Sequence, residues 1–376
     1  MIQIAQPYFG DEEFEALREP LATGWVTQGP KVKAFERAFA ERHGVKHAIA
    51  TTSCTTALHL IMVALGIGEN DEVIVPAFTW IATANVVVYC GARPIFVDVD
   101  PASFNIDPDL VAANVTARTK AIVPVHLFGL CADMNAIADA APGIPLVEDA
   151  ACAAGAAYRG ASAGSLGTAA AFSFHPRKTI TTGEGGMVTT NDDELAARLD
   201  CLRNHGAGIS EEQRAQGPAP YRLPDFDVVG FNYRMTDLQG ALGLVQLGRL
   251  DALVREREEW AAFYSRELAQ VAWLRTPVVP EEYKHGWQSY VCFVDETISP
   301  LSRNALMEQL HSRGVSTRPG THTVPTLGYY SRRYGVAPED FPGARDCHDK
   351  SIALPLHNQM SAEDYEYVVS SIFEAA

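Results

Sequence analysis

Six short runs rich in Val, Ile, Ala and Phe lie between residues 45 and 190, with helix-like stretches between them. The runs are VIVPA (73–77), PIFVDVD (94–100), AIVPVHLFG (121–129), PLVEDA (145–150), AAAFSFH (169–175) and GMVTTND (186–192). Their apolar residues are consecutive, whereas a strand with one face in water alternates apolar and polar residues. The pattern predicts an α/β fold with a mostly parallel central sheet, and ligands of such sheets bind at the carboxyl ends of the strands.

The length of the chain predicts two domains. Its 376 residues exceed the roughly 250 to 300 at which a single core stops growing. An amphipathic pattern over residues 236–270 predicts a long bridging helix, and the segments beyond it read as a strand over 289–295 followed by helices. We therefore predict a large domain over residues 1–250 and a smaller α+β domain over residues 251–376.

Composition and charge narrow the partners and the compartment. Hydrophobic residues make up 47% and charged residues 20% of the chain, which is ordinary for a globular protein. The net charge of −16 opposes a broad phosphate-binding surface, so we expect no nucleic acid partner. The chain starts without a basic stretch followed by an apolar one, so we expect a cytoplasmic protein.

The longest apolar run, Val73–Cys90, approaches the length of a membrane span. Because Pro76, Thr79 and Thr83 interrupt it, we interpret it as a strand, a turn and a buried helix, and we expect no membrane partner. Seven cysteines lie far apart without a CxxC pair, so neither a metal site nor a disulfide framework is expected.

Lys178 stands where the ligand of a parallel sheet is expected. In the segment SFHPRKTITTGEGGMVTTND (173–192), a strand ends at Ser173, Lys178 follows five residues later, and a glycine-rich turn leads into the next strand. A lysine amine attacks an aldehyde only when burial or a cationic neighbour lowers its pKa, and both the strand and Arg177 could do so. The alternative is a solvated surface charge, which this position disfavours.

Asp149 ends the otherwise apolar run PLVEDA, where a buried carboxylate requires a cationic partner. A protonated pyridine nitrogen would be such a partner, and it would let the ring absorb the electron pair that a departing proton leaves behind. The alternative is an acid that caps a helix. The neighbouring Glu148 is expected to point the other way.

Small hydroxyl residues precede an apolar helix predicted over residues 55–65. Ser53, Cys54 and Thr55 stand at its start, where free backbone N–H groups favour a phosphate. Helix capping alone would also explain Ser53 or Thr55.

These blocks resemble the sugar aminotransferase family called DegT/DnrJ/EryC1/StrS, within the aspartate aminotransferase superfamily. The likeness spans most of the chain: residues 24–50, residues 57–100, VPVHLFG (123–129), EDAA (148–151), SFHPRK (173–178), TTGEGG (181–186), LRNHG (202–206) and GFNYRMTDLQGALG (230–243). It implies the aspartate aminotransferase-like fold, fold type I of enzymes that use pyridoxal 5'-phosphate. It also implies that this cofactor becomes pyridoxamine 5'-phosphate in one half of the reaction.

The resemblance implies a role for each matching residue. Lys178 would carry the cofactor as a Schiff base and move the proton, and Asp149 would hold the pyridine nitrogen. The resemblance implies that Thr55 and Ser173 contact the phosphate and that Trp80, which could instead be a core tryptophan, stacks on the ring. Ser53, Cys54 and Cys152 are further expected cofactor neighbours. Asn232 would reach the partner's phosphate in a homodimer with shared sites, and Arg234 would point towards the substrate or the amino donor.

Two positions depart from the family pattern. Cys54 stands where the family usually has glycine, and Cys152 stands where it usually has the glutamine that holds the ring hydroxyl of the cofactor. A thiol is a weak hydrogen-bond donor, so this contact is open. Cys152 is then either a tolerated small neighbour or the mark of a subgroup with altered cofactor electronics.

The resemblance implies amino transfer from glutamate or glutamine to a nucleotide-linked keto-deoxy sugar. Related sugar dehydratases have histidine in place of the lysine, and a non-catalytic regulator would be expected to lose Lys178 or Asp149. A keto-cyclitol or another ketone of an antibiotic pathway remains an alternative substrate. Candidate substrate residues are His285, Gln288, Arg318 and His322. An arginine facing a diphosphate would favour the nucleotide sugar over the cyclitol.

Overall fold

The computed structural model describes residues 1–208, 221 and 223–375. Its large sheet has the spatial order β1 (His47–Thr51), β10 (Gly186–Thr190), β9 (Ala169–Ser173), β6 (Val147–Asp149), β5 (Thr119–Ile122), β2 (Glu72–Pro76) and β4 (Arg93–Val97). Single parallel bridges between Ile122 and Leu146 and between Val125 and Asp149 join the β5 and β6 regions. Only β10 is antiparallel to its neighbours, so the predicted mostly parallel sheet is confirmed.

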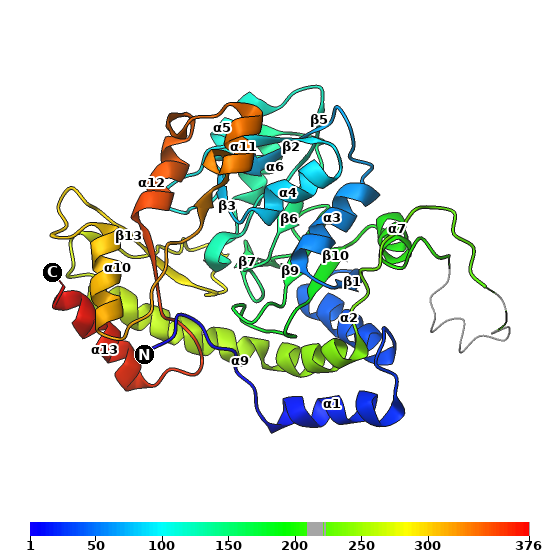
Figure 1. The fold of residues 1–376 in the computed structure, drawn as a ribbon, viewed down its shortest axis with the longest axis horizontal. Coiled ribbons are helices and arrows are strands. Elements are labelled where there is room, and N and C mark those ends of the chain that lie inside the picture. The colour runs from blue at the N-terminus through cyan, green and yellow to red at the C-terminus, as the bar shows by residue number, and fades with distance from the viewer. Residues whose placement is uncertain (209–220, 222, 376) are drawn as a thin grey trace.

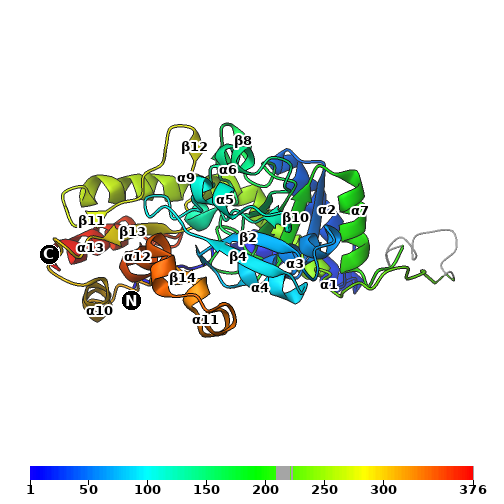
Figure 2. The same ribbon diagram turned by 90° about the horizontal axis from the view of Figure 1, so that it is seen from above.

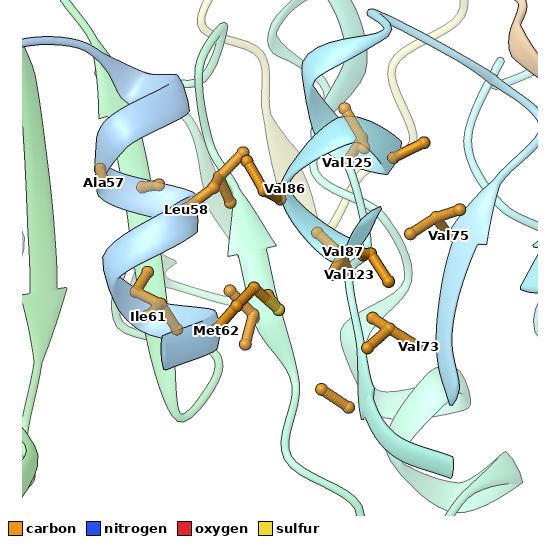
Figure 3. Packing of buried hydrophobic residues seen from close by; sticks show 14 of the residues in the cluster. Ala57, Leu58, Ile61, Met62, Val73, Val75, Val86, Val87, Val123 and Val125 are labelled. Atoms are coloured by element: carbon orange, nitrogen blue, oxygen red, sulfur yellow. The ribbon is translucent and has the colours of Figure 1, made fainter. Parts of the chain in front are cut away.

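Helices cover both faces of this sheet (Figures 1 and 2). On one face pack α3 (Cys54–Ala64), α4 (Ala82–Tyr89) and α7 (Asp193–Arg203), and on the other α2 (Pro30–His43), α5 (Pro108–Asn114), α6 (Met134–Ala140) and part of α9 (Asp237–Leu268). Consecutive residues of a strand point to opposite faces, so Val73 and Val75 join the first cluster and Ile74 the second. Figure 3 shows Leu58 and Met62 of α3 directed at the valines of the first cluster.

A second, antiparallel sheet lies towards the C-terminus. It consists of β11 (Leu274–Arg275), β13 (Tyr290–Val294) and β15 (Ser351–Leu354), and it packs with α10 (Arg303–Ser312), α13 (Ala362–Phe373) and the end of α9 around a separate core. Near the N-terminus, Ile2 pairs with Val315, and α1 (Asp11–Thr23) packs along α9. Helix α9 runs unbroken through residue 250 (Figure 1), so no change of secondary structure marks the proposed domain boundary. The division of the chain at residue 250 stays a prediction.

The chain returns to the large sheet after residue 320. There β14 (His322–Thr323) pairs with β3 (Phe78–Thr79), and α11 (Gly328–Tyr334) and α12 (Pro342–Lys350) follow. Their residues Tyr330, Ala344 and Cys347 belong to the core of the large sheet. The C-terminal segment therefore lies beside β3, directly before Trp80.

The remaining elements are short. A small sheet joins β7 (Ala157–Tyr158), β8 (Ala161–Ser162) and β12 (Tyr283–Lys284), and 3-10 turns span Leu127–Gly129, Val324–Thr326 and Pro338–Asp340. The apolar run Val73–Cys90 forms β2, β3 and α4, as predicted. Among the described residues, no helix is both long and apolar enough to cross a membrane.

Candidate active site

Asp149 is the last residue of β6, and its side chain is only 5% exposed. Its Oδ2 accepts a hydrogen bond from Thr83 Oγ1 at 2.8 Å, and its Oδ1 accepts one from the Ala151 N–H at 3.3 Å. Burial raises the pKa of the Asp149 carboxyl, while the Thr83 hydroxyl opposes that rise. No ion pair of Asp149 is found in the described part of the chain, so the carboxylate favours a cationic ligand group.

Glu148 points to the other side of the strand, as predicted. Its carboxylate is fully buried, lies 2.8 Å from His126 Nε2, and accepts hydrogen bonds from the backbone N–H groups of Gly164, Leu166 and Gly167 at 2.7 to 2.8 Å. Four partners satisfy the carboxylate without a ligand. Glu148 therefore anchors β6 and leaves Asp149 as the acid that faces the site.

Lys178 follows β9 in a tight turn, in which its backbone N–H donates to the His175 carbonyl at 2.8 Å. The side chain is half-buried, and Nζ lies 3.1 Å from Cys152 Sγ. Over residues 1–208 and 223–375, no carboxylate lies within ion-pair distance of this amine. The amine is therefore not held in a salt bridge and can engage a carbonyl group of a ligand.

Both cysteines that depart from the family pattern lie at this site. Cys54 Sγ is 3.5 Å from the Ala171 carbonyl oxygen and 3.9 Å from Asp149 Oδ1, whereas Cys152 contacts Lys178. Burial raises the pKa of the Cys54 thiol well above its usual range, and the Asp149 charge acts in the same direction. Cys54 is therefore a neutral neighbour of the carboxylate.

The residues expected around a phosphate lie where β9 ends and α3 begins. Ser53 caps α3, because its Oγ accepts the Thr56 N–H at 3.1 Å, so the capping alternative holds for this residue. Ser173 pairs with Gly186, and a Cβ on Gly186 would lie only 2.4 Å from the Ser53 backbone. Glycine at 186 thus allows the start of α3, with Thr55, to approach the end of β9.

Trp80 follows β3 and is 61% exposed, so the alternative of a core tryptophan is wrong. Its ring centroid lies 5.7 Å from that of His322, because Thr79 and His322 are paired between β3 and β14. An exposed indole beside a histidine offers a flat apolar surface to a ring-shaped ligand.

Arg318 and Gln288 approach the Lys178 turn from the C-terminal half. Burial lowers the pKa of the Arg318 guanidinium, the Arg177 charge lowers it further, and Cys152 opposes this. Gln288 is buried, and its Nε2 donates to the Arg177 carbonyl at 2.9 Å. Both residues therefore lie near Lys178.

His285 makes the contacts of a packing residue. Its ring stacks on Trp287 at 4.0 Å, and its Nδ1 accepts the Trp287 N–H at 2.8 Å. Burial lowers the pKa of His285 to about 3, so the ring is neutral at physiological pH.

Asn232 and Arg234 lie in a segment beside the start of α3. The carbonyl of Tyr233 between them accepts the Thr52 N–H at 3.1 Å. Asn232 is exposed and pairs with Asn204, whose Oδ1 accepts a hydrogen bond from Arg234 Nη1 at 2.9 Å. The predicted reach of Asn232 into a partner subunit stays a prediction.

Thr83 belongs to the candidate site, although in the sequence it is only one of the polar residues that interrupt an apolar run. Its hydroxyl contacts both Asp149 and Thr79 Oγ1, the latter at 3.0 Å. Two threonines four residues apart in an apolar segment were the available signal. Their partner Asp149 is 66 residues away, which spacing alone does not reveal.

The residues present fit pyridoxal phosphate. Within the described chain, Asp149 is a buried acid without an ion pair, Lys178 is an amine without a contacting carboxylate, and the start of α3 lies beside Ser173. A metal centre finds no such support, since the described residues contain no group of three or more His, Cys, Asp or Glu side chains that could hold an ion.

Comparisons with known proteins identify the family of this chain. The model of the DegT/DnrJ/EryC1/StrS aminotransferase family matches residues 7–373. The chain is 42% identical over 375 residues to GDP-perosamine synthase of Caulobacter vibrioides, covering 99% of this chain and 97% of that one. It is 40% identical over 370 residues to the spore coat polysaccharide biosynthesis protein SpsC of Bacillus subtilis, covering 97% and 95%.

Solved structures share the whole fold. The putative sugar aminotransferase Spr1654 of Streptococcus pneumoniae, in its pyridoxamine phosphate (PMP) form, superposes with a TM-score of 0.93 at 28% identity and covers 100% of this chain and 99% of that one. Its pyridoxal phosphate (PLP) form matches with a TM-score of 0.92. The predicted aspartate aminotransferase-like fold and pyridoxal phosphate cofactor are therefore confirmed. This chain is a pyridoxal phosphate-dependent enzyme that belongs to the DegT/DnrJ/EryC1/StrS aminotransferase family.

Proposed function

We propose that this aminotransferase moves an amino group from glutamate or glutamine to a nucleotide-linked keto-deoxy sugar, with Lys178 and Asp149 as its catalytic residues. The observation that carries the assignment is the state of these two groups. In the part of the chain that the structure describes, the Asp149 carboxylate is buried without an ion pair, and Lys178 Nζ contacts a thiol instead of a carboxylate, although the Lys178 charge lowers the pKa of Asp149 from a distance. Neither group contacts a partner of opposite charge there, and a cofactor with a cationic ring and a carbonyl would provide contacts for both.

The residues divide the work. Bound pyridoxal phosphate would supply a carbonyl for the amino group and a ring that takes up an electron pair. Asp149 would hold a proton on the ring nitrogen. Lys178 Nζ would take the proton from the α-carbon of the donor and deliver one to the carbon that becomes aminated, so the amine serves as base and then as acid. Ser53, Thr55 and Ser173 would hold the phosphate, and Trp80 would cover the ring.

The substrate proposal rests on the arginine near the site and on the relatives. Arg318 lies near Cys152 and therefore on the side of the Lys178 amine, where a guanidinium could pair with a diphosphate. Gln288, His322 and Arg234 are the other proposed substrate contacts. GDP-perosamine synthase, at 42% identity, carries a nucleotide sugar in its name.

A half-reaction tests the acceptor. The enzyme is loaded with pyridoxamine phosphate, and nucleotide keto sugars and keto-cyclitols are added in parallel, with absorbance recorded. We expect the absorbance of the pyridoxal form to return with nucleotide keto sugars, and the Arg318→Gln variant to require a higher concentration of them. A response to cyclitols alone would contradict the substrate proposal and leave the aminotransferase assignment in place.

We also propose that two copies assemble and share their sites. Large apolar side chains are exposed on α1, among them Phe14 at 70% and Leu21 at 62%, and also beyond residue 220, where Leu223 is 80% and Val229 is 90% exposed. Exposed apolar residues in such number favour burial against a second copy. Asn232 would then contact the cofactor phosphate of the partner. We further propose a cytoplasmic location, as the sequence suggests.

A further inference from the structure

A chain of buried hydroxyl groups ends at Asp149. Thr79 Oγ1 lies 3.0 Å from Thr83 Oγ1, which lies 2.8 Å from Asp149 Oδ2, and the three residues are 1%, 0% and 5% exposed. An ionised carboxylate can only accept hydrogen bonds. The Thr83 hydroxyl must therefore donate its single proton to Asp149 and accept a hydrogen bond from Thr79. The hydrogen bonds thus run in one direction, from Thr79 through Thr83 to Asp149.

Thr83 makes the shortest hydrogen bond to the Asp149 carboxylate. The other contacts, the Ala151 N–H at 3.3 Å and Cys54 Sγ at 3.9 Å, are both longer and both fall on Oδ1. In the described chain, Oδ2 has Thr83 as its only hydrogen-bond partner. A hydrogen bond to a charged, buried acceptor is stronger than one between neutral groups.

The same chain braces the turn that carries Trp80. Thr79 ends β3 before Trp80, and Thr83 follows it in the first turn of α4, with its N–H donating to the Trp80 carbonyl at 3.2 Å. On the other side, Thr321 Oγ1 donates to the Thr79 carbonyl at 3.0 Å. The hydroxyl pair thus links Asp149 to the exposed indole and to the strand of His322.

We propose that Thr83 is a positioning residue: its hydroxyl, oriented by Thr79, fixes the Asp149 carboxylate and thereby sets how tightly the enzyme holds the ring nitrogen of pyridoxal phosphate. The inference rests on the proposed role of Asp149. Thr83 itself touches neither substrate nor cofactor in this scheme. Its effect passes through the orientation and charge of one carboxylate.

The test uses the shape-conserving substitution Thr83→Val. Loaded enzyme is dialysed against a series of pyridoxal phosphate concentrations, and bound cofactor is read by absorbance. We expect Thr83→Val to weaken cofactor binding about ten-fold or more, because a bond to a charged group is lost. Thr83→Ser retains the hydroxyl and should bind within about three-fold of the wild type.

Thr190→Val is the matched control. Thr190 is 2% exposed, its hydroxyl donates to the Thr168 carbonyl at 2.8 Å and accepts the Asp192 N–H at 3.1 Å, and it lies at the opposite end of β10 from Gly186. It should bind the cofactor as the wild type does. Thr79→Val should weaken binding in the same direction as Thr83→Val but by less, and it decides the question if Thr83→Val does not fold.

A double-mutant cycle separates positioning from general damage. In an Asp149→Asn background the charged acceptor is absent. The fold-loss of cofactor affinity caused by Thr83→Val should therefore be less than half of the loss that it causes in the wild type. An equal loss of cofactor affinity in both backgrounds would overturn the proposal. So would a Thr83→Val variant that binds the cofactor as tightly as Thr190→Val does. If Asp149→Asn itself binds cofactor and turns over like the wild type, the proposed catalytic role of Asp149 fails instead.

Discussion

At the scale of single residues, the candidate site holds two groups of opposite charge, neither of which forms an ion pair with the described residues. Asp149 is surrounded by hydroxyl, amide and thiol donors, and Lys178 contacts the thiol of Cys152. A salt bridge to either residue would satisfy it internally and remove it from ligand chemistry. The protein therefore retains an unfavourable buried charge where we propose that the cofactor binds.

The unfavourable burial of the Asp149 charge predicts how the Asp149→Asn substitution changes the free energy of unfolding. Burial raises the pKa of Asp149 above 3.8, so this carboxyl destabilises the folded, cofactor-free protein at pH values above its raised pKa. We expect cofactor-free Asp149→Asn to be more stable than the wild type by about 1 kcal/mol at pH 7.5, and the gain to vanish as the pH falls towards 3.8.

Adding pyridoxal phosphate should reverse that order. The wild type should gain more thermal stability than Asp149→Asn, because only the wild type offers the ring nitrogen a full negative charge. Thermal unfolding of both proteins, with and without cofactor, measures the effect. A variant that is less stable than the wild type at pH 7.5 without cofactor would contradict the account of Asp149.

Some residue roles follow from the sequence and others do not. Asp149 stands out because it is a charged residue at the end of an apolar strand, and Lys178 because it lies between a strand and a glycine-rich turn. Thr83 does not stand out, because its partner is 66 positions away and its own surroundings are apolar. Likewise, the exposure of Trp80 depends on the β3 and β14 pairing, which joins residues more than 240 positions apart.

At the scale of elements, the site depends on close approach between the first residues of α3 and β10. A Cβ on Gly186 would lie 2.4 Å from the Ser53 backbone and 2.7 Å from the Cys54 nitrogen, both of which are fixed main-chain atoms. Each of the six predicted runs contains a strand. These strands could be predicted because continuous apolar runs are typical of strands that are buried on both faces. The strand β1 and its place beside β10 were not predicted, since its five residues HAIAT give little periodicity.

Gly186→Ala should displace α3 from the sheet edge. We expect cofactor affinity to fall about ten-fold or more and the free energy of unfolding to fall by about 1 to 3 kcal/mol, because the added methyl group meets backbone. Gly68→Ala is the control, since its Cβ would meet nothing within 4 Å. Equal cofactor affinity in both variants would show that the approach of α3 does not shape the site.

At the scale of the whole molecule, the long helix α9 runs under the large sheet and on into the C-terminal part (Figure 1). Sequence periodicity predicted this helix over 236–270, and the structure confirms it over Asp237–Leu268. The return of residues 322–350 to the large sheet was not predicted, because it depends on contacts with β3 and on core packing that no local pattern encodes.

The exposed apolar face of α1 predicts the oligomeric state. We expect the wild type to sediment as a dimer, and Phe14→Glu combined with Leu21→Lys to shift it towards a monomer with aminotransferase activity reduced at least about ten-fold, because the sites would no longer be shared. Glu12→Gln, at an exposed position on the opposite side of the same helix, should leave the dimer intact. A fully active monomer would refute shared sites.

The most direct test of the central claim compares the wild type with Lys178→Ala by absorbance and turnover. The wild type should show the visible-to-near-ultraviolet band of bound pyridoxal phosphate, and the band should shift when glutamate or glutamine is added. Lys178→Ala should lower the turnover number by about 100-fold or more, because the proton carrier is lost. Lys120→Ala, at an exposed position on β5, should behave as the wild type. Amination by Lys178→Ala at the wild-type rate would contradict the account.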